Sequence, residues 1–155
     1  QSDLANFLLD ELIAVKEELT VEVTNSSAAD KTDRWIPPAA NSTTSAGRVV
    51  WNLKSQVYAI EKQYKQPDLS NFQKFLALFA SDRVERLSPA LVLMHELGHA
   101  CQFLTNKAEF RKQLADKNIL EVENINVNAI ENTVAKELTA KNNKEGLRWD
   151  YLDAR

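Results

Sequence analysis

The only two histidines of this 155-residue chain, His95 and His99, stand four residues apart, and Glu96 directly follows the first of them. On an α-helix a four-residue step returns to the same face, so both imidazoles can point at one metal ion. Glu96 lies about 100° around the helix, where it can reach a water bound to that ion. The spacing therefore predicts a helix that carries two zinc ligands and a general base. The alternative is a pair of ordinary surface or core histidines.

The residues around this motif predict a buried helix over 88–106. Apart from Glu96 its central flanks are uncharged, which suits a helix whose polar groups must each find a partner. Ser88 and Pro89 predict its start, because serine caps a helix and the N–H that proline lacks is not needed at the first helical position. Gly98 would weaken an ordinary helix by up to about 1 kcal/mol relative to alanine. We interpret it as room for close packing beside the metal, with simple tight helix packing as the alternative.

A catalytic zinc site needs a third protein ligand, and with no further histidine in the chain this ligand must be a carboxylate. Glu123 heads an apolar stripe of a helix expected over 119–140, so its side chain faces the core. The stripe consists of Val127, Ile130, Val134 and Leu138. Burying an unpaired carboxylate is costly and zinc removes that cost, so Glu123 is the preferred ligand; a carboxylate favoured by the helix dipole is the alternative. Glu131, about 80° around, is the second candidate, and Glu121 on the opposite face is expected to be solvated.

Helical spacing of apolar residues predicts five or six helices in all and little strand. Besides the two helices above, they cover residues 3–19, 50–64, 69–79 and a short stretch around Phe110 and Leu114. Residues 19–24 alternate and predict a short strand. The stretch 25–47 is rich in Asn, Ser, Thr, Ala and Pro and is interpreted as a long loop that could grip a substrate. The expected fold class is mainly α, a compact helical domain with little or no sheet.

Length, charge and cysteine content narrow the class of protein. A chain of 155 residues predicts a single domain, 1–155. The net charge of −3 provides no basic surface for nucleic acid, and no apolar run approaches the roughly 18 residues of a membrane span. Cys101 is the single cysteine, so it cannot form an internal disulfide. We expect a monomer that binds neither nucleic acid nor membrane.

Residues 88–151 carry a resemblance to known proteins. The stretch from Val92 to Cys101 resembles the extended zincin motif, with uncharged residues at every flanking place. Glu123, the run Asn128-Ala129-Ile130-Glu131-Asn132, and Arg148-Trp149-Asp150-Tyr151 are similar to the NleD-like bacterial effector metalloproteases. Those effectors carry an E-N pair on a late helix and an R-x-x-Y after it, and clostridial neurotoxin light chains also place an R-x-x-Y late in the chain.

This resemblance implies a minimal, gluzincin-like zinc metalloendopeptidase. His95, His99 and a glutamate, Glu123 in the first place, would bind one zinc ion, and Glu96 would be the general base. Arg148 and Tyr151 would face the oxyanion, where such donors are worth roughly 2.7–4 kcal/mol; a surface arginine and a packing tyrosine are the alternative. The resemblance further implies an effector that a bacterium secretes into the host cytosol to cleave a host protein, with actin as the best single guess. A cytoplasmic protein is the other expectation for location.

Two other functions stay open from the sequence. The chain could be a non-catalytic, zinc-containing module that binds a partner protein, or a zinc hydrolase of non-peptide amides. A coordination position open to water distinguishes an enzyme from a closed structural site. A substrate screen is needed to separate peptide from non-peptide amides.

Overall fold

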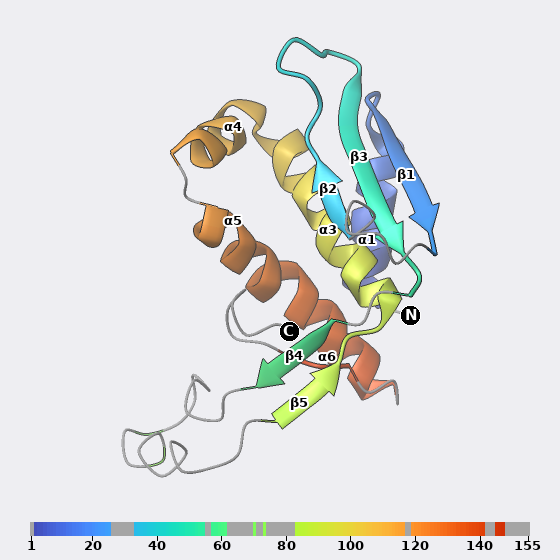
Figure 1. The fold of residues 1–155 in the computed structure, drawn as a ribbon, viewed down its shortest axis with the longest axis vertical. Coiled ribbons are helices and arrows are strands. Elements are labelled where there is room, and N and C mark those ends of the chain that lie inside the picture. Colours follow the sequence, from blue (N-terminus) through green and yellow to red (C-terminus); the bar gives the residue numbers. More distant parts are fainter. Residues whose placement is uncertain are drawn as a thin grey trace.

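A computed structural model of the chain describes residues 2–25, 33–54, 57–61, 70, 73, 83–116, 119–141 and 145–147. In chain order its elements are α1 (Asp3–Ala14), β1 (Glu18–Thr24), β2 (Arg34–Ile36), β3 (Ser45–Asn52), β4 (Tyr58–Glu61), β5 (Arg83–Arg86), α3 (Pro89–Thr105), α4 (Lys107–Ala115), α5 (Ile119–Asn126), the π-helix η3 (Val127–Glu131) and α6 (Asn132–Ala140). The last three run on as one helix. Figure 1 shows this long helix crossing beside α3, with the larger sheet on the other side of α3.

The larger sheet has three strands in the order β1-β3-β2. β1 runs parallel to β3, and the short β2 runs antiparallel to it. The central strand contains the β-branched pair Val49 and Val50, which are 0% and 1% exposed. Such residues suit a strand that is covered on both faces. β4 and β5 form a separate antiparallel pair.

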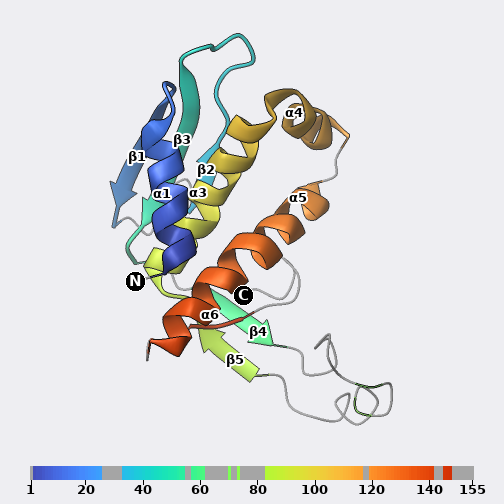
Figure 2. The ribbon, with the colours of Figure 1, turned by 180° about the vertical axis from the view of Figure 1, so that it is seen from behind.

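Helix α3 lies at the centre of the core. Seen from behind, α1 and α3 lie on one face of the three-stranded sheet (Figure 2). The main apolar cluster joins Val49 of β3 to Leu91 and Leu97 of α3 and to Val134 of α6. A second cluster, made of Phe103, Phe110 and Val122 with Trp35 packed against it, joins α3, α4 and α5. The two clusters hold α3 between the sheet and the last helix.

Several predicted elements agree with the structure. α3 begins at Pro89 after its Ser88 cap and ends at Thr105, as the start signal predicted. α4, the helical stretch 119–140 and the strand at 19–24 are also present. The first helix ends at Ala14 instead of continuing to residue 19, because the chain turns there into β1.

The helix expected over 50–64 is wrong, because its described residues belong to β3, a turn and β4. Apolar residues three and four apart fit a helix, but Val49, Val50 and Trp51 form a parallel strand pair with β1. This pairing joins distant segments, so the local spacing does not reveal it. The expected loop 25–47 contains β2 and the start of β3. The fold is therefore mainly helical with a small mixed sheet, which corrects the expectation of little or no sheet. The helix expected over 69–79 lies outside the described residues, apart from 70 and 73. Among the helices described, none is long and apolar enough to cross a bilayer.

Candidate metal centre

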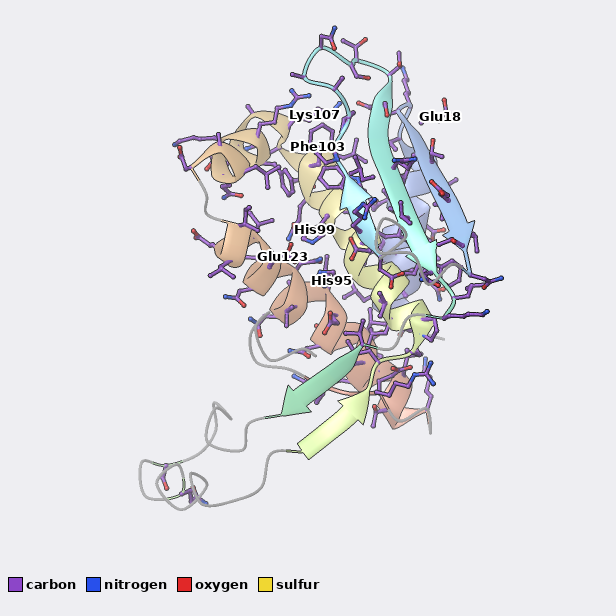
Figure 3. All side chains as sticks on the ribbon, in the orientation of Figure 1. Glu18, His95, His99, Phe103, Lys107 and Glu123 are labelled. Atoms are coloured by element: carbon purple, nitrogen blue, oxygen red, sulfur yellow. The ribbon has the colours of Figure 1, made fainter. Side chains whose placement is uncertain are left out.

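The two histidines lie on the buried part of α3. The side chain of Ser88 accepts the N–H of Leu91 at 3.1 Å and so caps the helix. Two turns later, His95 and His99 are 5% and 6% exposed. Figure 3 shows both side chains between α3 and α5, with Glu123 of α5 beside them. The element that carries the motif is thus the helix that the sequence predicted.

Glu123 meets both imidazoles at one carboxylate oxygen. Its Oε2 lies 3.1 Å from His95 Nε2 and 3.1 Å from His99 Nε2, and one ligand atom from each residue lies within 4.8 Å of the others. Ligands bound at roughly 2.0–2.2 Å in a tetrahedron around zinc lie about 3.3–3.5 Å apart. Two imidazoles and a carboxylate are also a donor set of catalytic zinc sites. These three residues therefore fit a zinc ion.

Each histidine has an oxygen acceptor beside its Nδ1 atom. The Nδ1 of His95 lies 3.0 Å from Oε2 of Glu131, and the Nδ1 of His99 lies 3.3 Å from Oε1 of Gln102. A proton on Nδ1 that is donated to such an acceptor leaves the lone pair on Nε2 and fixes the ring orientation. A bound zinc ion would then take the lone pairs of both Nε2 atoms, which in its absence lie within hydrogen-bond distance of Glu123.

Glu131, the second ligand candidate, therefore lies behind His95 and is fully buried, at 0% exposed. In a regular α-helix it would be about 80° around from Glu123. The π-helix η3 (Val127–Glu131) absorbs one extra residue in a turn, so the eight-residue step counts as about seven and the angle falls to about 20°. The π-turn thus aligns both carboxylates toward α3.

The carboxylates control the protonation of the metal-free site. Burial alone would lower the pKa of His95, but hydrogen bonds to Glu123 and Glu131 outweigh it and raise that pKa from 6.5 to about 9. Burial would raise the pKa of Glu123, yet hydrogen bonds from His95 and His99 lower it to about 2. The cluster attracts a positive charge, and a metal ion that takes this place has to displace a proton.

Glu96 is oriented by the edge of the sheet. Its Oε2 accepts the backbone N–H of Trp35 in β2 at 2.5 Å. Glu96 is 8% exposed. Burial raises the pKa of its carboxyl, although the charges of His95 and His99 act in the opposite direction. Glu96 lines the same pocket as the three candidate ligands. The sequence predicted Glu96 but not the amide that holds it.

The pocket has a volume of about 180 Å³ and two different walls. One wall consists of Asp33, Arg34, Trp35 and Pro37, which fall within the stretch proposed to grip a substrate. The other is apolar and comes from α4 and α5, with Phe110, Leu114, Ile119 and Val122. This apolar wall could not be recognised from the sequence, because the same apolar residues are equally compatible with the core. Gln102 was also missed, although its position three residues after His99 places it on the same face.

Gly98 of α3 packs closely against α5 and η3. A Cβ added there would lie 2.1 Å from Asn126 Oδ1 and 2.7 Å from Ile130 Cδ1. The Nδ2 of Asn126 donates to the backbone carbonyl of His95 at 2.6 Å. Tight packing at Gly98, as interpreted from the sequence, therefore lets α5 bring Glu123 to the histidines.

Arg148 and Tyr151, the predicted oxyanion pair, lie outside the described residues, and their role stays a prediction. Neither a protein-family model, nor a curated protein, nor a solved structure gave a match to this chain. The function is therefore inferred from the geometry of the site.

Proposed function

We propose that this chain is a zinc-dependent endopeptidase that holds one zinc ion with His95, His99 and Glu123. The observation that carries the proposal is the group of three ligand atoms within 4.8 Å of one another, placed at a pocket that Glu96 also lines. A structural zinc site is closed by four protein ligands. The described residues supply three, which supports a site with a position left for water or substrate.

A zinc ion in this site supplies Lewis acidity, which polarises a carbonyl group and lowers the pKa of water. Glu96 takes a proton from the water that adds to the scissile carbonyl carbon. When the C–N bond breaks, Glu96 delivers that proton to the leaving nitrogen. The N–H of Trp35 holds one oxygen of the Glu96 carboxylate, so the base is oriented before substrate arrives. Glu131 and Gln102 orient the two imidazoles.

A peptide substrate is supported by the resemblance to effector metalloproteases and by the pocket. The apolar wall from α4 and α5 offers contact area to a side chain, while Asp33 and Arg34 add charged groups to the lining. We propose a host protein as the substrate and secretion into the host cytosol as the setting. Actin is the first protein to test, and it rests on the resemblance alone.

The proposal is tested with the zinc-loaded protein and its Glu96→Gln variant. Each is incubated with a eukaryotic cell lysate and with purified actin, and new N-termini are identified by mass spectrometry. Cleavage by the wild type but not by Glu96→Gln is expected, with one zinc ion per chain in both proteins. Cleavage that survives in Glu96→Gln would contradict the role of the base.

Zinc content provides a readout that is independent of activity. Glu123→Ala should lose stoichiometric zinc, whereas Glu121→Ala on an exposed position of the same helix should keep it. Zinc binding that is unchanged in Glu123→Ala would contradict the metal site itself. Bound zinc without any new N-termini would instead favour the protein-binding module or a hydrolase of non-peptide amides.

A further inference from the structure

The two outer strands of the three-stranded sheet differ in how they are protected. β2 has three residues, is followed by Pro37 and Pro38, and gives the N–H of Trp35 to Glu96. Short length and proline are the usual means by which proteins block an edge strand. β1 (Glu18–Thr24) has seven residues, contains no proline, glycine or lysine, and among the described strands pairs with β3 alone. Within the part of the chain that the structure describes, β1 is therefore an open edge.

The backbone groups on this open edge belong to apolar residues. The N–H of Glu18 donates to Thr44 and the carbonyl of Thr24 accepts from Leu53, so the even-numbered residues turn toward β3. Because backbone groups alternate along a strand, Leu19, Val21 and Val23 turn theirs outward.

The side chains of β1 add an apolar surface to this edge. Val21 is in register with Val49, which belongs to the core cluster with α3, so Val21 and Val23 project to the helix-covered face. They are nevertheless 44% and 55% exposed. Figure 2 views this face and shows β1 at its outer margin, with α1 next to it. On α1, Leu9 and Ile13 are also exposed, at 39% and 80%.

We propose that β1 is a dimerisation strand, which pairs antiparallel with β1 of a second copy of this chain about a two-fold axis at Val21. The two three-stranded sheets would then form one six-stranded sheet. The same patch serves on both copies, as a two-fold interface requires. Antiparallel pairing uses the outward groups of Leu19, Val21 and Val23 for about six hydrogen bonds.

In this register each residue of β1 lies opposite a compatible residue of β1 in the second copy. Val21 meets Val21 of the second copy and Leu19 meets Val23, while Glu18 and Glu22 meet threonines, Thr24 and Thr20. No like charges lie directly opposite, and Glu22 is already paired with Arg48 at 3.0 Å. A register shifted by one residue would place Val21 opposite Glu22 and lose this match.

The second copy leaves the candidate metal centre open. β1 and β2 are at opposite edges of the sheet, and the pocket is lined from the β2 side. The dimer therefore does not depend on the proposed peptidase activity. The monomer expected from the sequence is the alternative that the tests below distinguish from it.

The first test compares Val21→Pro with Val21→Thr by sedimentation velocity. The N–H of Val21 faces outward, so proline in both copies removes two hydrogen bonds between them and none to β3; threonine keeps both the N–H and the strand propensity. Wild type and Val21→Thr should be dimers at about 100 µM. At this concentration a dimer forms when its free energy of association is roughly 5–6 kcal/mol or more. Val21→Pro should be a monomer with an unchanged circular dichroism spectrum.

The second test fixes the register by cross-linking in a Cys101→Ser background. Val21→Cys should form a disulfide-linked dimer under mild oxidation, because directly opposed Cα atoms lie about 5.5 Å apart, within disulfide range. Thr20→Cys should not, since its counterpart is displaced along the strand. A wild-type monomer at about 100 µM would overturn the proposal and leave the edge to an extended segment of another protein. Equal cross-linking of both variants would overturn it as well.

Discussion

Replacement of Gly98 by alanine tests the packing that assembles the candidate metal centre. In an isolated helix this change stabilises by about 0.8–1.0 kcal/mol, because alanine is the better helix former. In this protein the new Cβ would lie 2.1 Å from Asn126 Oδ1 and 2.7 Å from Ile130 Cδ1. Both contacts are too short for a methyl group, so α5 or its side chains must move.

The expected cost follows from the groups that move. Overpacking a core costs about 1–3 kcal/mol. Displacing the Asn126 amide breaks its 2.6 Å hydrogen bond to the His95 carbonyl, and buried groups left unpaired cost about 1–3 kcal/mol more. After the helix gain of about 1 kcal/mol is subtracted, we expect a net loss of about 1–5 kcal/mol. Because Glu123 and Glu131 move with the same helix, zinc affinity should fall about 10–100-fold.

Urea unfolding of the metal-free protein measures the stability, and competition with a chromophoric chelator measures the zinc affinity. The matched control is Asn126→Ala, alone and combined with Gly98→Ala. If the clash with Asn126 is the cause, Gly98→Ala should cost about 0.5–3 kcal/mol less in the Asn126→Ala background. A Gly98→Ala protein that is as stable as the wild type, or more stable, would refute the reasoning, since helix propensity alone predicts that result.

Three further changes test other parts of the structure. Glu131→Gln, which weakens the acceptor behind His95, should reduce zinc affinity about 10–100-fold without abolishing stoichiometric binding; unchanged affinity in a chelator competition would count against that role. Removal of zinc with a chelator should leave the circular dichroism spectrum intact while the melting temperature falls, because zinc at 100 times its Kd contributes about 2.7 kcal/mol; complete unfolding would indicate a structural site. The hydroxyl of Ser2 and the N–H of Leu4 lower the pKa of Glu137 below its usual 4.5, so the charged form stabilises the fold above that pH and the contribution is lost as the pH falls through the lowered value. Acid unfolding curves of wild type and Glu137→Gln should converge at low pH, and curves that stay parallel would contradict this.

The helices near the site could be predicted because their signals are local. The Ser88 cap, Pro89 and the four-residue spacing of the histidines all lie on one segment, and α3 forms as those signals indicate. Glu123 could be ranked first by its place on an apolar stripe. The position of Glu131 could not be predicted, since the angle depends on the π-turn η3, and a regular helix was the only basis available.

The sheet and the support of Glu96 depend on distant segments. Val50, Leu53 and Val57 have helical spacing, but pairing of β3 with both β1 and β2 decides the conformation of this stretch. That pairing also brings the amide of Trp35 to Glu96, 61 residues away in the chain. Neither contact leaves a signal within one segment.

The donors of the candidate site can be read from the sequence: two histidines one helical turn apart, a base next to the first, and a carboxylate that must complete the set because no third histidine exists. The packing of the helices then placed Glu123 beside both Nε2 atoms and Glu131 beside the Nδ1 of His95. Helix periodicity assigns a side chain to a face of its helix, whereas the packing of α5 against Gly98 and the extra residue of the π-turn determine which residues that face contacts.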